Sequence, residues 1–395
     1  MASGLAGTLA AVPRNVLGAN DRIRVGIVGA GDRGMELVNQ IRLCPNVEVA
    51  GFADIYTKRL EKAVGAVPAA KTYANPQSLF EDPSIDAVVL ATPPHLHAEQ
   101  FSAALASSKH VYLEKTLALT VDDAKRMRTA WRADDGRHAV QIGHQACSHG
   151  QMSDVKQFLR EPSRLGQVTA LAMRHFRNTP PSKPQWARPT LLTSDVNARN
   201  VDWKAFLGNS GEHAFDPQRL IHWRYFWETS GGGVSENMSQ QLAFWIRALD
   251  LQIPASASMT GGVYLWNDGR EVPDTMQVSF EQSERMLVAW SSGFGNNHQG
   301  IGEDLLGSAG TIVRGSEIRY VPQKTAASPH GEMLGRATNV PHAHMQNFFD
   351  AIRLNREVNC PFDVGFRVAV ASSMAVQSYR EQRIVRWDPV AEEIV

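Results

Sequence analysis

Three glycines between Gly29 and Gly34 have the spacing G-x-G-x-x-G, and their position in the chain makes that spacing meaningful. The strand-like run RIRVGIV precedes them, and helical spacing follows from Met35 to Arg42. At such a junction the first two glycines allow a tight turn and close approach to a pyrophosphate. The third lets helix and strand pack, and the helix N-terminus stabilises phosphate charge. The sequence therefore predicts a dinucleotide site formed by Gly29, Gly31, Asp32, Arg33 and Gly34.

Asp54 ends the next expected strand, VEVAGFAD, twenty positions after Gly34. A carboxylate at this point accepts hydrogen bonds from the adenosine ribose hydroxyls and repels a 2′-phosphate, which favours NAD over NADP. Lys58 and Arg59 follow closely and weaken that preference, because either side chain can reach toward a phosphate. The alternative interpretation is a glycine turn that binds no cofactor.

Thr92 and Pro93 follow the expected strand DAVVLA, at the carboxyl edge where doubly wound sheets bind ligands. We expect both residues to flank the cofactor. His97 lies just inside the following helix, where it either contacts the cofactor or only packs.

Strands and helices alternate regularly from Ile23 to Gln145, and the strands are apolar nearly throughout. This pattern predicts an α/β domain, a Rossmann doubly wound parallel sheet over residues 21–145.

Beyond Gln145 the runs VTALAMRHF, TMQVSF, MLVAWSS, GTIVRG and EIRYVP contain period-two stretches. They predict an α+β domain over 146–395 with an open, mostly antiparallel sheet that binds substrate and mediates oligomerisation. We expect helices at 237–248, 342–354 and 366–380, and a long surface loop at 178–200.

Composition limits the function classes. The 395 residues indicate two domains, and 40 basic residues balance 40 acidic ones, so no global field attracts nucleic acid. No apolar run approaches the roughly 18 residues that cross a bilayer.

Three separated cysteines indicate neither disulfides nor a cysteine zinc site, and His342 and His344 lie two apart, so we expect no metal. Residues 1–20 read either as a disordered arm or as a shortened export leader, so the location is either cytoplasmic or periplasmic.

The run from Ala91 to Thr120, ATPPHLHAEQFSAALASSKHVYLEKTLALT, together with the glycine motif, resembles the Gfo/Idh/MocA oxidoreductase family. The stretches VDWKAFLG, HWRYFWETSGGG and CPFDVGFRVAV are similar to its C-terminal signatures. The resemblance implies that Glu114 and Lys115 belong to the family's EKP triplet, with Thr116 in place of proline, and that Lys115 lies beside the nicotinamide. A partly desolvated lysine there has its charged form disfavoured, so it can accept a substrate hydroxyl proton.

The resemblance also implies an Asp and a His four residues apart on a helix facing the nicotinamide. In this chain those positions fall on Glu236 and Gln240. Glutamate can orient a hydroxyl or hold Lys115, whereas glutamine cannot take a proton. The base is therefore Lys115, Glu236, or a histidine from elsewhere, with His144, His149 and His222 as candidates. Family members also place polar contacts to nicotinamide and substrate where His144 and Gln145 lie.

An aromatic and cationic cluster precedes the triple glycine at 231–233. Its composition suits stacking on a sugar face and hydrogen bonding to sugar hydroxyls, although part of such a cluster packs in the core. The cluster contains Trp223, Arg224, Tyr225 and Trp227.

Three functions remain open. The leading hypothesis is an NAD-dependent oxidoreductase that takes a hydride from a secondary hydroxyl of a sugar, cyclitol or glycoside, with Lys115 handling the proton. The second is an NAD-dependent glycoside hydrolase or lyase that oxidises its sugar transiently, and the third is a catalytically silent sugar or nucleotide sensor. We expect a homodimer or homotetramer, because an open sheet usually buries its uncovered face.

Overall fold

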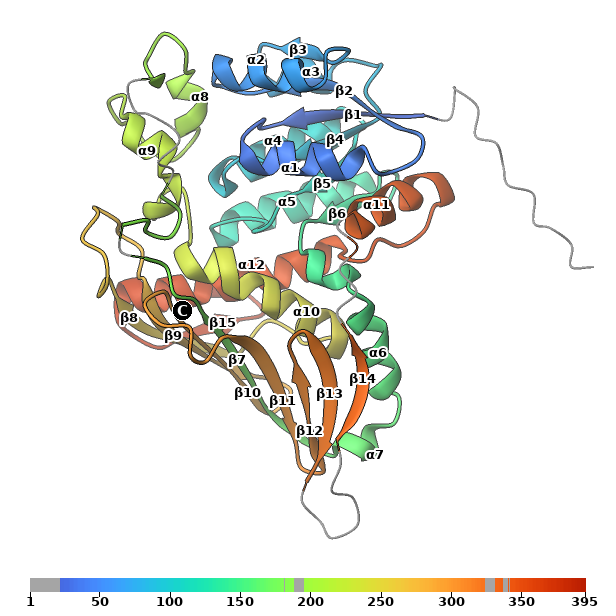
Figure 1. Ribbon diagram of the computed structural model, residues 1–395, viewed down its shortest axis with the longest axis vertical. Coiled ribbons are helices and arrows are strands. Elements are labelled where there is room, and N and C mark those ends of the chain that lie inside the picture. The colour runs from blue at the N-terminus through green and yellow to red at the C-terminus, as the bar shows by residue number, and fades with distance from the viewer. Residues whose placement is uncertain (1–21, 181, 188–194, 324–330, 337–339, 341) are drawn as a thin grey trace, which may run out of the picture.

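The computed structural model describes residues 22–180, 182–187, 195–323, 331–336, 340 and 342–395. Two sheets lie at opposite ends of the molecule, with α10 (Ser239–Leu249) and α12 (Phe362–Glu381) between them (Figure 1). The arm expected at residues 1–20 lies outside the described residues, as does part of the loop expected at 178–200. No described helix has both the length and the apolar character that a membrane crossing needs.

The first sheet has six parallel strands in the order β3-β2-β1-β4-β5-β6. Val88 and Val89, neighbours on β4, are both inaccessible to solvent and join hydrophobic cores on opposite faces of the sheet. Burial on both faces explains the continuous apolar runs, and the predicted doubly wound parallel sheet is confirmed. The strands are β1 (Ile23–Val28), β2 (Val47–Ala53), β3 (Lys71–Tyr73), β4 (Ala87–Leu90), β5 (His110–Leu113) and β6 (Val140–Ile142).

Helices cover both faces of this sheet. The Thr120 hydroxyl accepts a hydrogen bond from Asp123 N and so caps the N-terminus of α5. The elements are α1 (Asp32–Ile41), α2 (Thr57–Ala66), α3 (Pro76–Phe80), the 3-10 turn η2 (Pro94–Leu96), α4 (His97–Ala106) and α5 (Val121–Asp134).

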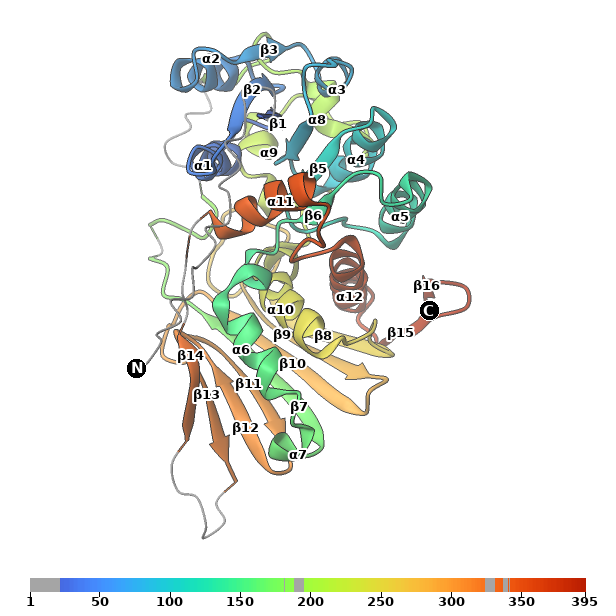
Figure 2. The ribbon, with the colours of Figure 1, turned by 90° about the vertical axis from the view of Figure 1, so that its right-hand side faces the viewer.

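Helix α11 (Ala343–Leu354) comes from the second half of the chain but packs on the first sheet (Figure 2). Met345, Phe348 and Phe349 are fully buried in the same core as Tyr112 of β5. Gln141 Nε2 also donates to the carbonyl of His344 over 2.6 Å. The two halves of the chain therefore pack together at the first sheet.

The second sheet has ten strands in the order β14-β13-β12-β11-β7-β10-β9-β8-β15-β16. Its described pairs are antiparallel except for β7 with β10, which confirms the predicted mostly antiparallel sheet. The strands are β7 (Val168–Phe176), β8 (Ser256–Gly262), β9 (Thr275–Gln282), β10 (Met286–Gly293), β11 (Ile301–Gly307), β12 (Gly310–Arg314), β13 (Glu317–Pro322), β14 (Glu332–Arg336), β15 (Val385–Asp388) and β16 (Glu393–Ile394).

One face of this sheet is covered by α6, α10 and α12 (Figure 2). Along β10, Val288 and Trp290 are buried beneath the helices, whereas Leu287 on the opposite face is 54% exposed. The remaining elements are η3 (Gln145–Ser148), α6 (Gly150–Phe158), α7 (Pro162–Leu165), α8 (Trp203–Leu207), α9 (Pro217–Ile221), the 3-10 turn η5 (Trp223–Tyr225) and the π-helix η6 (Val234–Met238).

Several elements were not predicted from the sequence, and helices are more frequent after residue 145 than expected. Helices α6, α8 and α9 and strands β3, β8, β11 and β14 belong to this group. Helix α12 also begins at Phe362, four residues before the expected start.

Candidate active site

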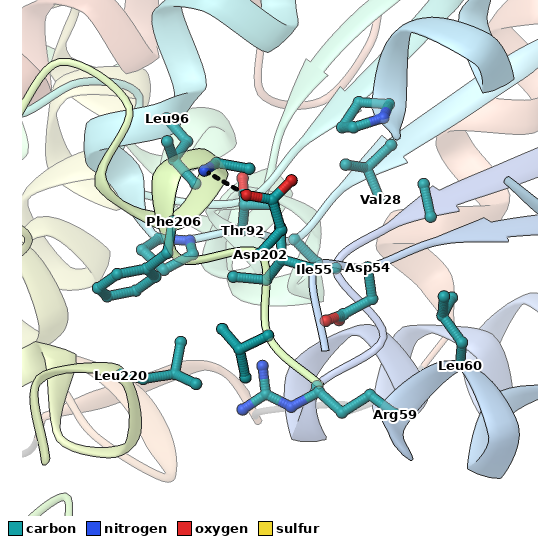
Figure 3. Close-up of a pocket in the computed structure, with 18 of the residues that line it drawn as sticks. Val28, Asp54, Ile55, Arg59, Leu60, Thr92, Leu96, Asp202, Phe206 and Leu220 are labelled. Carbon is teal, nitrogen blue, oxygen red and sulfur yellow. Dashed lines mark hydrogen bonds between the residues drawn. The ribbon is translucent and has the colours of Figure 1, made fainter. Parts of the chain in front are cut away.

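A cavity of about 490 Å³ lies at the carboxyl ends of β1, β2 and β4 (Figure 3). Gly29 has φ of +90°, and a Cβ added to Gly34 would lie 1.9 Å from the carbonyl oxygen of Gly29. Only glycine permits this close turn of backbone into helix α1. We call this space the nucleotide cavity. The predicted residues that line it are Gly29, Gly31, Asp32, Arg33, Asp54, Thr92, Pro93, Trp223 and Arg224.

Asp54 fixes the loop around the nucleotide cavity. Its Oδ2 accepts a hydrogen bond from Ala30 N (2.7 Å) and its Oδ1 accepts one from Tyr56 N (2.8 Å). Burial raises the pKa of Asp54, while Arg59 and the two backbone N–H groups oppose that shift. Arg59 lines the cavity, whereas Lys58 forms an ion pair with Asp195 over 3.4 Å.

A segment from the second half of the chain covers the nucleotide cavity on the side opposite Asp54. The sequence analysis did not predict this position. Thr57 N donates to Asn200 O over 3.0 Å, and Asp202 N donates to Ile55 O over 2.9 Å. Figure 3 shows Phe206 and Leu220 across the cavity from Asp54. The only sequence signal was the expected loop at 178–200, which ends where this cover begins.

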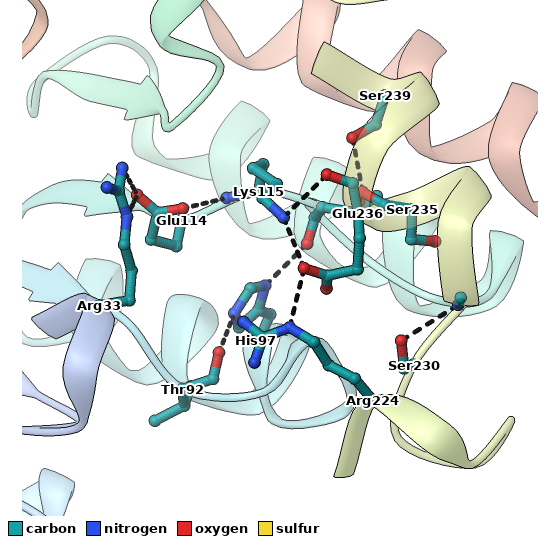
Figure 4. Close-up of polar contacts among 12 residues, drawn as sticks. Arg33, Thr92, His97, Glu114, Lys115, Arg224, Ser230, Ser235, Glu236 and Ser239 are labelled. Atoms are coloured by element: carbon teal, nitrogen blue, oxygen red, sulfur yellow. Dashed lines mark hydrogen bonds and ion pairs between the residues drawn. The ribbon is translucent and has the colours of Figure 1, made fainter. Parts of the chain in front are cut away.

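Lys115, Glu236 and Arg224 converge at one carboxylate oxygen (Figure 4). Glu236 Oε2 lies 2.9 Å from Lys115 Nζ and 2.9 Å from Arg224 Nε. The Lys115 and Glu236 side chains are 13% and 8% exposed. Burial alone would raise the pKa of Glu236, but the charges of Arg224 and Lys115 and their hydrogen bonds lower it to about 2. The carboxylate is thus ionised at neutral pH.

The π-helix η6 presents backbone carbonyls to the loop that carries Lys115. Lys115 Nζ donates to Glu236 O over 3.3 Å, and Thr116 Oγ1 donates to Ser235 O over 2.8 Å. Because a π turn leaves carbonyls outside the usual helical pairing, these acceptors are available to another segment. Thr116, at the position where the resemblance implies a proline, therefore anchors the lysine loop through its side chain.

A second cavity, of about 330 Å³, lies on the far side of Glu236. Glu236 and Gln240 both line it, as their i, i+4 spacing on one helix face predicted. Glu236 therefore touches Arg224, which lines the nucleotide cavity, while itself lining the second one. Lys115 lines neither cavity itself, and it reaches them through Glu236, which lines the second cavity and is paired with Arg224 of the nucleotide cavity.

Three predicted cofactor contacts brace the site and do not line either cavity. Glu114 Oε1 accepts hydrogen bonds from Arg33 Nε (2.9 Å) and Nη2 (2.8 Å). Gln145 Nε2 lies 3.3 Å from Gln40 Oε1. His97, fully buried, lies between the carbonyl oxygens of Thr92 and Thr116, each 2.9 Å from a ring nitrogen, and so joins the loops after β4 and β5.

None of the three histidines proposed as bases lines either cavity in the described structure. His144 is fully buried, and burial, followed by the charges of Lys115 and His344, lowers its pKa to about 3, with Gln240 opposing that shift. His149 is the residue just before α6, and burial and the charge of Arg314 lower its pKa. His222 Nδ1 lies 2.9 Å from Gln218 Oε1, and its ring stacks on Tyr225. His175, which was not predicted, lines the second cavity instead.

The aromatic cluster divides between cavity and core. Trp223 and Arg224 line the nucleotide cavity, with the Arg224 guanidinium 4.0 Å from the centre of the Trp223 ring. Tyr225 is buried under Arg270, and Trp227 packs against Tyr379. In the part of the chain that the structure describes, no three His, Cys, Asp or Glu side chains are grouped to hold a metal ion.

Comparison with known proteins finds similar sequences and similar folds. Residues 23–144 match a family model described as "Oxidoreductase family, NAD-binding Rossmann fold". The inositol 2-dehydrogenase of Mycolicibacterium smegmatis is 30% identical over 188 residues, which are 47% of this chain and 52% of that protein. The chain thus matches about half the length of this curated relative.

Two solved structures share the fold over nearly their whole length. The WlbA dehydrogenase of Bordetella pertussis, in complex with NADH and UDP-GlcNAcA, has a TM-score of 0.71 at 18% identity, covering 93% of this chain and 98% of that one. Levoglucosan dehydrogenase, in complex with NADH and levoglucosan, has a TM-score of 0.69 at 17% identity, covering 92% and 99%.

The shared carboxylate leads to a pH prediction. The pKa of Glu236 is about 2 in the folded protein against an ordinary value of 4.5, so its stabilising contribution is present above pH 4.5 and is lost as the pH falls toward 2. We expect Glu236→Gln to lower the free energy of unfolding by about 3 kcal/mol at neutral pH, because two buried cations lose their partner. The difference from wild type should shrink between about pH 5 and pH 2, measured by urea unfolding at stepped pH.

The matched control is Glu61→Gln, which changes an exposed glutamate on α2. Its free energy of unfolding should stay within about 0.5 kcal/mol of wild type at every pH. A Glu236→Gln deficit that is independent of pH would contradict the assigned ion pairs.

Proposed function

We propose that this chain is an NAD-dependent sugar or polyol dehydrogenase, because residues 23–144 match the Gfo/Idh/MocA oxidoreductase family model, as the motifs predicted, and the chain resembles an inositol 2-dehydrogenase. The enzyme oxidises a secondary hydroxyl of a sugar, cyclitol or glycoside. The observation that carries the proposal is the chain of contacts from Lys115 to Glu236, which lines the second cavity, and from Glu236 to Arg224, which lines the nucleotide cavity.

The residues around the nucleotide cavity fit a dinucleotide. The turn at Gly29 and Gly34 brings backbone close to the N-terminus of α1, which favours a pyrophosphate. Asp54 and Arg59 lie at the far side, where the adenosine ribose would bind, and Thr92 and Pro93 flank the path toward Lys115. When bound, the cofactor supplies the hydride acceptor.

The proton is handled by Lys115. Its Nζ is oriented by Glu236 Oε2 and by the backbone oxygen of Glu236, so the amine has a fixed direction. Arg224 shares the carboxylate and keeps it ionised, which leaves Glu236 as an orienting group. Gln240 lines the substrate side and offers a hydrogen-bond donor and acceptor to a hydroxyl, but no base.

A second candidate function is a redox-neutral glycoside cleavage, in which the sugar is oxidised, eliminates its aglycone, and is reduced again. The observation that favours it is the cover over the nucleotide cavity, where Asn200 and Asp202 are hydrogen-bonded to the β2–α2 loop. A cofactor enclosed in this way exchanges slowly, which suits a cycle that returns its hydride.

We also propose that the chain forms a homo-oligomer through the uncovered face of the ten-stranded sheet. Strand register places one row of residues across five strands of this face. The row contains three exposed apolar side chains, and contiguous apolar surface of this kind marks an interface. The row is Leu287, Ala170, Leu306, Thr311 and Val321.

Gly34→Ala tests the cofactor cradle. The new Cβ would meet the Gly29 carbonyl at 1.9 Å, so we expect the turn to open and NAD affinity to fall by at least about tenfold, measured by calorimetry. Gly65→Ala is the matched control, because a Cβ at that position on α2 has no neighbour within 4 Å and NAD binding should be unchanged. Equal NAD affinity in both variants would contradict the proposed cradle.

Lys115→Met tests the proton step. We expect kcat to fall by about 10²–10⁴-fold, because the positioned group that holds the reacting hydroxyl is lost, while the affinity for NADH changes little. NADH formation from myo-inositol, D-glucose and D-glucuronate would be followed by absorbance, and the fastest substrate would be used for the variants. Lys62→Met, an exposed lysine on α2, should retain wild-type rates. Absence of turnover with every substrate in a broad polyol panel would defeat the dehydrogenase proposal.

The redox-neutral alternative predicts a different readout. Incubation with p-nitrophenyl glycosides should release p-nitrophenol without net NADH, and removal of bound cofactor should abolish that release. Stoichiometric NADH with no aglycone release would instead assign simple oxidation.

Leu287→Glu combined with Leu306→Glu tests the sheet interface. Each charge would be buried against its symmetry mate, so we expect the mass from light scattering at micromolar concentration to fall to that of a monomer. Lys71→Glu, on the exposed edge strand β3, is the control and should leave the mass unchanged. A wild-type protein that is already monomeric would refute the interface.

A further inference from the structure

The second cavity is rich in hydrogen-bond donors. Arg177 and Arg314 both line it, and so do His175, Asn237 and Gln240. Among the described residues, Asn237 Nδ2 and His175 Nε2 are buried without a hydrogen-bond partner. Buried polar atoms are normally paired, so these two indicate that a ligand completes them.

The carboxylates near this cavity are already neutralised. Glu236 is paired with Lys115 and Arg224. Glu303 accepts two hydrogen bonds from Arg314 Nη1, at 2.7 and 2.6 Å, and another from Trp245 Nε1 at 2.8 Å. Neither carboxylate has a charge left to offer to Arg177.

Arg177 is different from the other cations of the site. It is exposed at the end of β7, and no carboxylate among the described residues forms an ion pair with it. Burial and the adjacent Arg177 charge lower the pKa of His175 to about 4, so its ring is neutral at physiological pH and its Nε2 can serve as a neutral donor or acceptor. The cavity mouth thus presents one unpaired guanidinium beside a neutral ring.

The lining of the second cavity carries an excess of positive charge. Two guanidinium groups, Arg177 and Arg314, line it with one carboxylate, Glu236, which is already paired with Lys115 and Arg224. Because Arg314 is paired with Glu303, Arg177 is the cation that an anionic group of a ligand would complement.

We propose that the substrate of this site is a sugar acid, and that Arg177 is the specificity-determining residue that binds its carboxylate at the mouth of the second cavity. A planar guanidinium binds a carboxylate through two parallel hydrogen bonds, which fixes the ring orientation as well as the charge. His175 and Asn237 bind the neighbouring hydroxyls, and the hydroxyl to be oxidised reaches Lys115. This inference rests on the proposed dehydrogenase function and names its substrate class.

The Glu303 and Arg314 pair makes the floor of this cavity rigid. Gln241 Nε2 donates to Glu303 Oε1 over 3.0 Å, and Trp290 Nε1 donates to Gln241 Oε1 over 2.9 Å. Arg314 Nε also donates to Gln151 Oε1 over 3.0 Å. A fully satisfied network of this kind keeps Arg314 in place and occupies its hydrogen bonds. The unpaired Arg177 therefore distinguishes an acidic substrate from a neutral one.

The test is a binding measurement on the NADH-loaded protein, in which no oxidation can occur. The probes are the methyl glycosides of D-glucuronate, D-galacturonate and D-mannuronate, each compared by calorimetry with the methyl glycoside of its neutral hexose. We expect at least one acid to bind at least about tenfold more tightly than its neutral partner, the size expected for a charge-assisted contact. Arg177→Gln should remove this preference, and Arg160→Gln, an exposed arginine outside both cavities, should retain it.

Three outcomes would overturn the inference: neutral partners that bind as tightly as the acids, an acid preference that survives Arg177→Gln, or no binding of any acid. None of these depends on turnover, so they are separable from failure of the proposed function, which would show as absent NADH formation across the polyol panel. If NADH itself does not bind, the dehydrogenase proposal fails, and the same titration on cofactor-free protein still decides the acid preference.

Discussion

A single buried carboxylate, shared by two cations, holds the candidate active site together. Glu236 lies in the π-helix η6, and Lys115 follows strand β5 of the first sheet. Arg224 lies in the turn η5, which lines the nucleotide cavity. This group of three charges stabilises the fold only while every member is present, because loss of one leaves a buried charge uncompensated. The direction of the lysine and the position of Arg224 in the nucleotide cavity therefore depend on this one oxygen.

Much of the fold was predictable where burial leaves a simple pattern. The first sheet was recognised because its strands are covered on both faces and are therefore apolar nearly throughout. Strand β3 was missed because it is a short, largely exposed edge. Strand β11 was missed because the buried Glu303 interrupts its apolar alternation, and only the later Arg314 makes that burial tolerable.

The site was predictable only in part. Lys115 and Glu236 were identified through motifs that resemble a family, but their mutual contact spans 121 positions of sequence. The histidines misled because a loop position says nothing about burial, and His144 is enclosed while His175 lines a cavity from a strand. The cover at Asn200 and Asp202 reaches the β2–α2 loop by backbone hydrogen bonds, which leave no side-chain signature in the sequence.

The five-residue π-helix η6 also constrains how this protein can change by insertion or deletion. A wide turn accommodates one more residue than an α-helical turn, so each residue after it is offset by about 100° around the axis. Removing one residue from 234–238 would restore ordinary winding and rotate α10 as a unit, carrying Gln240 away from its cavity and Gln241 away from Glu303. The geometry of the site therefore depends on the number of residues in this short window.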